Sequence, residues 1–169
     1  MIELKVPDKV LLEARDMAED MGKLRNSITR GQGNIAGFIG EIMAREHYGA
    51  KQANTYDYDL IDSDGKRIDV KTKRTSVAPK EHYDCSVAKL SLHQDCDAYV
   101  FTRVKNDYTL CWILGMIDHD RYFELARFLK KGERDGDNGF TVKSDCYNLS
   151  IEALSNEDPS IRHRDQSSP

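Results

Sequence analysis

An aspartate and a lysine stand two residues apart in the run 67–73, RIDVKTK. Apolar Ile68 and Val70 alternate there with polar residues, which predicts a β-strand with one face against the core. Because successive side chains of a strand point to opposite sides, Asp69 and Lys71 would share a face. An acid and a lysine would thus lie side by side, and carboxylate oxygens are suited to hard cations such as Mg²⁺. A D-x-K spacing by itself is common, so its meaning depends on the surrounding residues.

A second aspartate, Asp59, lies in the preceding run 56–62, YDYDLID, which we expect to form the partner strand across the turn SDG. A two-residue turn would put Asp59 and Asp69 on opposite faces, whereas a three-residue loop with Gly65 left-handed would bring them opposite each other, about 5 Å apart. We favour the three-residue loop, because facing aspartates destabilise a sheet unless a cation between them reverses that cost. Asp57 is the alternative to Asp59, since it shares the same face.

A third carboxylate, Glu41, lies in the run 34–48, whose apolar spacing predicts a helix. Two glycines three residues apart, Gly37 and Gly40, would let this helix approach another backbone closely. Glu41 would then point at a site. The alternative is an exposed helix acid paired with Arg45 four residues later.

The stretches GFIGEIMAREHYGA and YDYDLIDSDGKRIDVKTKRT together resemble the core of the PD-(D/E)XK nuclease superfamily, which includes restriction endonucleases and Holliday junction resolvases. The family pattern is a helix with a glutamate, a strand with an aspartate, and a neighbouring strand with (D/E)-x-K. Matched residue by residue, the resemblance implies Glu41, Asp59, Asp69 and Lys71 as the catalytic centre, with Tyr58 where many members have a proline. It also implies an α/β fold with a restriction endonuclease-like core, a mixed central β-sheet flanked by helices.

The resemblance implies a Mg²⁺ cofactor, for which Mn²⁺ would substitute. Asp59, Asp69 and the Val70 carbonyl would be ligands, with Glu41 bound directly or through water. Lys71 would orient the attacking water and stabilise charge on the phosphate.

Positive charge is concentrated near this segment, although the formal net charge of the chain is −4 and its pI about 5.7. Six basic residues and one acid lie between positions 66 and 80. Contacts of lysine and arginine with phosphates position a nucleic acid without reading its bases. We expect such contacts from Arg67, Lys73, Arg74, Lys80 and Arg30.

These features favour a Mg²⁺-dependent nuclease that hydrolyses phosphodiester bonds in DNA, with endonuclease action as the first hypothesis and RNA as an alternative substrate. A structure-specific resolvase and an exonuclease are the rivals among nucleases. A non-catalytic nucleic-acid-binding module of the same fold is the alternative from another class. A homodimer would supply the two sites needed to cut both strands, and the compact size is similar to that of phage enzymes.

The chain of 169 residues predicts a single domain, 1–155, followed by a polar, flexible tail, 156–169. No apolar run approaches the roughly 18 residues that span a bilayer, and the N-terminus is unlike a signal peptide, so we expect a cytoplasmic protein without a membrane partner. Besides those named above, we predict helices at 8–22 and 120–131 and strands at 82–88, 98–105, 108–117 and 140–149.

Two histidine–cysteine pairs, His82 with Cys85 and His93 with Cys96, contain zinc-ligand types. They are separated by a short stretch with no finger-like layout, so we interpret Cys96 as a core residue and the four cysteines as reduced. Residues of this region that would line a nucleic-acid groove are His82, His93, Gln94, Ser86 and Lys89.

Overall fold

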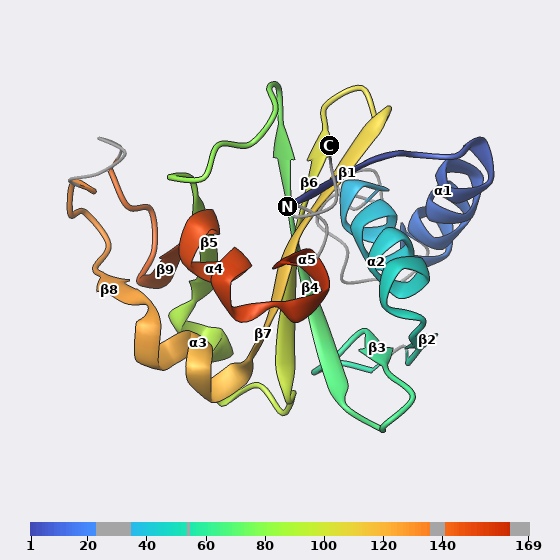
Figure 1. Ribbon diagram of the computed structural model, residues 1–169. Coiled ribbons are helices and arrows are strands. Elements are labelled where there is room, and N and C mark those ends of the chain that lie inside the picture. Colours follow the sequence, from blue (N-terminus) through green and yellow to red (C-terminus); the bar gives the residue numbers. More distant parts are fainter. Residues whose placement is uncertain (23–34, 54, 136–140, 163–169) are drawn as a thin grey trace.

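The computed structural model describes residues 1–22, 35–53, 55–135 and 141–162 (Figure 1). Its main feature is a six-stranded mixed sheet in the order β1-β7-β6-β4-β3-β2, in which β4 and β6 are parallel and the other pairs antiparallel. The strands are β1 (Ile2–Lys5), β2 (Lys51–Gln52), β3 (Leu60–Ile61), β4 (Arg67–Thr75), β6 (Ala98–Lys105) and β7 (Leu110–Asp118). The predicted α/β class with a mixed sheet and flanking helices is confirmed at this level.

The central strand β6 reads AYVFTRVK and is buried along almost its whole length. Such continuous apolar runs are typical of strands covered on both faces, and the predicted bounds 98–105 are confirmed. Strand β3 is much shorter than the predicted run 56–62. Leu60 and Ile61 pair with β4, and the residues before Leu60 leave the sheet.

Two helices, α1 (Asp8–Gly22) and α2 (Ile35–Tyr48), cover one face of the sheet (Figure 1). Gly40 of α2 lies directly over the sheet, since a Cβ on it would fall 2.5 Å from Thr102 Oγ1 and closer still to Thr72 Oγ1. The predicted close approach is therefore confirmed at Gly40, whereas a Cβ at Gly37 would meet nothing within 4 Å.

A second, three-stranded antiparallel sheet and the helix α3 (His119–Leu125) lie on the other side of the main sheet (Figure 1). Its strands are β5 (Asp84–Ala88), β9 (Cys146–Ser150) and β8 (Arg127–Leu129), in that order. A 3₁₀ helix, η2 (Lys89–His93), follows β5. The predicted helix 120–131 is wrong in its second half, where residues 127–129 pair with β9 instead.

The predicted tail from position 156 is wrong for residues 156–162. Helices α4 (Ile151–Glu157) and α5 (Pro159–Arg162) pack beside the half of β7 that β1 leaves uncovered. Buried Asp158 accepts hydrogen bonds from Tyr48 Oη and from the Met116 backbone N–H, both at 2.8 Å. These bonds protect a strand edge and tie the C-terminal segment to α2. No helix within the described ranges is both long and apolar enough to cross a membrane.

Candidate functional site

The hairpin of β3 and β4 fixes how the two strand aspartates face each other. Leu60 pairs with Ile68, and the Asp62 N–H donates to the Lys66 carbonyl at 3.1 Å across a three-residue loop. Gly65 occupies the left-handed region with φ 84°. The predicted three-residue loop is thus confirmed. The strand pairing ends at Leu60, and the N–H of the next residue outward, Asp59, donates to the Ile68 carbonyl at 2.9 Å, which keeps Asp59 beside β4 next to Asp69.

Asp59 is held where β3 leaves the sheet. Its carboxylate accepts a hydrogen bond from the Val70 backbone N–H at 2.8 Å, which takes the place of a ladder bond from the missing strand. Burial and the neighbouring Asp69 raise the pKa of Asp59 to about 6, against the lowering effect of that hydrogen bond and of Lys71. Asp59, rather than Asp57, is therefore the aspartate that shares its surroundings with Asp69.

Asp69 and Lys71 form a close pair on one face of β4, as the strand alternation predicts. Asp69 is 6% exposed, and its Oδ2 lies 2.6 Å from Lys71 Nζ. Gln94 bridges the two residues: its amide donates to Asp69 Oδ1 at 2.9 Å and its carbonyl accepts from Lys71 Nζ at 3.3 Å. The same Gln94 amide donates to the Asp57 carbonyl at 2.6 Å, which ties the segment before β3 to the site.

Glu41 reaches the same region from α2. Burial and the two aspartates, Asp59 more than Asp69, raise its pKa to about 8, while a hydrogen bond from Gln52 at 3.5 Å lowers it. The alternative pairing with Arg45 is wrong, because Arg45 instead binds Glu13 of α1 at 2.9 Å. Three carboxylates from one helix and two strands therefore repel one another in a partly dry environment.

The donor set suits a hard divalent cation, because carboxylate and carbonyl oxygens are the ligands that Mg²⁺ prefers. A cation would remove the repulsion that raises the pKa of Glu41 and of Asp59. Gln52 Oε1, next to Glu41, is buried without a hydrogen-bond partner in the described part of the chain. Within these same residues, no three acid, histidine or cysteine side chains lie close enough together to hold a metal ion as they stand. Asp69 Oδ2 is in ion-pair contact with Lys71 and, within the described part of the chain, has no hydrogen-bond partner. Binding would therefore require Asp69 to exchange a contact with Lys71 for one with the cation.

The predicted phosphate-binding residues separate into different positions. Lys73 lies on the same face of β4 as Lys71, whereas Arg74 lies on the opposite face, 5.9 Å from the ring centre of Tyr108. Lys80 is exposed in the loop before β5. Arg30 lies outside the described residues.

The expectation that Arg67 contacts phosphates is not supported by its surroundings. Its guanidinium pairs with Asp95 at 2.7 Å and with Asp97 at 2.8 Å. These contacts hold the pKa of Asp97 at about 2. Arg67 therefore fixes the loop before β6, a role hidden in the sequence because its partners lie about thirty residues away.

Gln94 is the site residue that was predicted least well from the sequence, since it was expected along a groove and lies instead between Asp69 and Lys71. All four cysteines are free thiols. The two that belong to the histidine–cysteine pairs, Cys85 and Cys96, are buried in the hydrophobic core. Burial raises the pKa of Cys96 to about 11, so its thiol is protonated at neutral pH. Comparisons of this sequence with protein-family models and with curated proteins find no match.

Proposed function

We propose that this protein is a divalent-metal-dependent nuclease of the PD-(D/E)XK type, with a restriction endonuclease-like core, acting on DNA. The observation that supports the proposal best is the position of the Asp59 carboxylate, which accepts a hydrogen bond from the Val70 N–H directly after Asp69, while Asp69 contacts Lys71 at 2.6 Å. The raised pKa of Glu41, caused by burial and by both aspartates, supports the inclusion of this third carboxylate.

In this proposal Asp59, Asp69, the Val70 carbonyl and Glu41 hold Mg²⁺, with Mn²⁺ as a substitute. The bound ion polarises the scissile phosphate and lowers the pKa of a water molecule. Glu41 and Asp59 remain ionised in its presence, because the charge that raised the pKa of each is then offset.

Lys71 has two parts in the reaction. While Asp69 is free of metal, Lys71 neutralises it across 2.6 Å. Once Asp69 turns to the cation, the ammonium group is available to orient the water and to stabilise the negative charge that develops on the phosphate. Gln94 keeps both side chains in reach, since it bonds to each of them. Lys73 and Lys80 extend the positive surface toward the neighbouring phosphates of the strand.

Nicking of supercoiled plasmid DNA in Mg²⁺ or Mn²⁺ tests the proposal. Asp69→Asn and Lys71→Ala are each expected to lower the rate by at least about a hundredfold, the usual effect of removing a catalytic group. Asp64→Asn in the hairpin loop is the matched control, because it makes the same chemical change at an exposed position, and it should cleave like the parent. Absence of cleavage by the parent in both metals would contradict the proposal, and DNA binding without cleavage would favour the non-catalytic module.

A further inference from the structure

A small pocket lies next to the catalytic pair, between the main sheet and the second sheet. Its volume is about 210 Å³. Strand β4 contributes Lys71 and Lys73 to its wall, β6 contributes Arg103, and β5 contributes Asp84 and Ser86. Because Lys71 lines both the pocket and the candidate active site, a group bound in one is a neighbour of a group bound in the other.

Lys73 and Arg103 are direct neighbours on this wall. They are paired in the parallel register of β4 and β6, and therefore point to the same face. Partial burial and the nearby Arg103 lower the pKa of Lys73. Like charges in directly opposed positions destabilise a sheet, and neither residue forms an ion pair with a carboxylate in the described part of the chain. Among the described residues, Asp84 is the nearby acid on this wall, and it forms no ion pair with either cation.

Arg103 is the deeper of the two cations, with 6% of its surface exposed. To the described residues it donates one hydrogen bond, to the Asp84 backbone carbonyl at 3.0 Å, and its guanidinium lies 5.3 Å from the ring centre of Tyr83. An arginine carries five N–H donors, so most of its capacity is left for a ligand. The contacts with Asp84 and Tyr83 hold the guanidinium in place as a preformed binding group.

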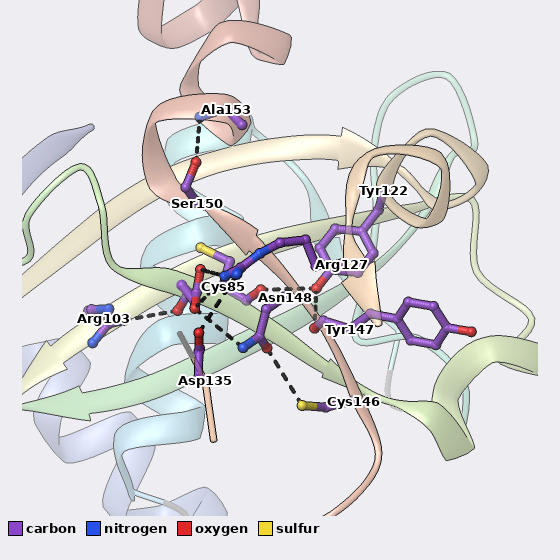
Figure 2. A network of polar contacts seen from close by, with 11 residues as sticks. Cys85, Arg103, Tyr122, Arg127, Asp135, Cys146, Tyr147, Asn148, Ser150 and Ala153 are labelled. Carbon is purple, nitrogen blue, oxygen red and sulfur yellow. Dashed lines mark hydrogen bonds and ion pairs between the residues drawn. The ribbon is translucent and has the colours of Figure 1, made fainter. Parts of the chain in front are cut away.

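The one acid on the pocket wall does not cancel this charge. The Asp84 carboxylate accepts hydrogen bonds from Asn148 at 3.3 Å and from Arg127 at 3.4 Å. Figure 2 shows these partners in a polar network, with Arg103 at its margin. Arg127 also lies 3.7 Å from the buried Asp135, so it offsets Asp84 only in part. The pocket wall therefore presents two adjacent cations, Lys73 and Arg103, against one acid that is shared with Arg127.

We infer that this pocket binds a terminal phosphate of the nucleic-acid substrate, an inference that rests on the proposed nuclease function. A phosphate monoester carries close to two negative charges at neutral pH, which matches two adjacent cations better than the single charge of an internal diester. The volume is below the roughly 300 Å³ of typical small-molecule pockets, which suits a phosphate group and excludes an enclosed base and sugar. Ser86 is exposed at the rim and can donate a further hydrogen bond. Cleavage near a phosphorylated strand end would then be faster than cleavage of closed circular DNA, since the terminal phosphate would locate the scissile bond beside Lys71.

Binding measurements in EDTA test this inference without requiring cleavage. The probes are fluorescently labelled short DNA duplexes that carry a 5′-phosphate, a 3′-phosphate, or hydroxyl groups at both ends. For the parent, one of the phosphorylated duplexes is expected to bind about tenfold more tightly than the hydroxyl-ended one, since charge-assisted hydrogen bonds are the strongest of their kind. Which duplex gains identifies the end that is recognised.

Lys73→Gln should remove this advantage. Because Lys73 also faces the phosphates of the strand in the proposed complex, the readout is the ratio of the two affinities, which should fall to about one whatever the loss in affinity for the hydroxyl-ended duplex. Lys9→Gln is the control, because Lys9 is an exposed lysine on α1, across the sheet, that pairs with Glu46. Arg103→Lys serves as a second variant, checked for folding by circular dichroism, and should weaken the preference. Equal binding of all three duplexes by the parent, or an unchanged preference in Lys73→Gln, would overturn the inference. A preserved phosphate preference together with no cleavage in Mg²⁺ or Mn²⁺ would support the pocket and contradict the nuclease proposal.

Discussion

Replacement of Glu41 by glutamine should stabilise the metal-free protein at neutral and alkaline pH. Burial, Asp59 and Asp69 raise the pKa of Glu41 from 4.5 to about 8. Between these two values the folded protein holds a proton that the unfolded chain has lost. The free energy of unfolding of the parent therefore falls as the pH rises through this window, by about 1.4 kcal/mol per pH unit for one proton.

The full interval corresponds to a cost on the order of 4 kcal/mol by pH 8. Glutamine keeps the shape of the side chain and carries no charge, so Glu41→Gln avoids most of this cost. We expect a gain of roughly 2 to 4 kcal/mol at pH 8, which is on the order of 5 to 15 °C in Tm for a chain of this size. At pH 5 the side chain of the parent is already protonated, so the two proteins should melt at nearly the same temperature.

Thermal melts of the parent and Glu41→Gln in EDTA, at pH 5 and pH 8, measure this effect. Glu46→Gln is the matched control on the same helix, because Glu46 is exposed and makes a surface ion pair with Lys9 that contributes at most about 1 kcal/mol. Addition of Mg²⁺ at pH 8 should raise the Tm of the parent and of Glu46→Gln, and should have little effect on Glu41→Gln. Equal melting of the parent and Glu41→Gln at both pH values would refute the burial of Glu41 among the aspartates.

Three further predictions concern the elements that position the site. Gly40→Ala should lower the free energy of unfolding, measured by urea denaturation, by about 1 to 3 kcal/mol, because the added Cβ has no room above the sheet. Gly37→Ala should raise it by up to about 1 kcal/mol, since alanine has the higher helix propensity and the added Cβ meets nothing. Equal effects of the two substitutions would contradict the packing of α2. Gln94→Ala should lower the nicking rate by about ten- to a hundredfold with little change in Tm, because Asp69 and Lys71 lose the side chain that bonds to both of them. An unchanged rate would show that Gln94 does not position these two residues. Asp158→Ala should lower the free energy of unfolding by about 2 to 4 kcal/mol in urea denaturation, because Tyr48 Oη and the Met116 N–H both lose their hydrogen-bond acceptor. A loss below about 0.5 kcal/mol would show that the C-terminal segment does not support the fold.

The hairpin at the site could be predicted from sequence because its determinants are local. Side chains alternate with a period of two, and Gly65 supplies the left-handed residue that a three-residue loop needs. The helix that carries Glu41 was likewise visible in its apolar spacing. These local rules were sufficient to bring the Asp59 carboxylate beside β4 and close to Asp69.

Features that depend on distant partners could not be predicted in this way. Arg67 is held by acids that follow it by about thirty residues, and no local pattern marks that contact. Strand β8 is three residues long and exists because β9 lies beside it. Arg103 appears in sequence as a polar interruption of an apolar strand, and its position next to Lys73 emerges from the parallel register.

The central claim is that Glu41, Asp59 and Asp69 surround one divalent cation beside Lys71. Anomalous X-ray diffraction from crystals soaked in Mn²⁺ tests it most directly. We expect an anomalous peak in contact with the carboxylates of Asp59 and Asp69, with Lys71 Nζ withdrawn from its 2.6 Å contact with Asp69. A saturating soak with no peak between these carboxylates, or with peaks elsewhere and the Asp69–Lys71 pair intact, would contradict it.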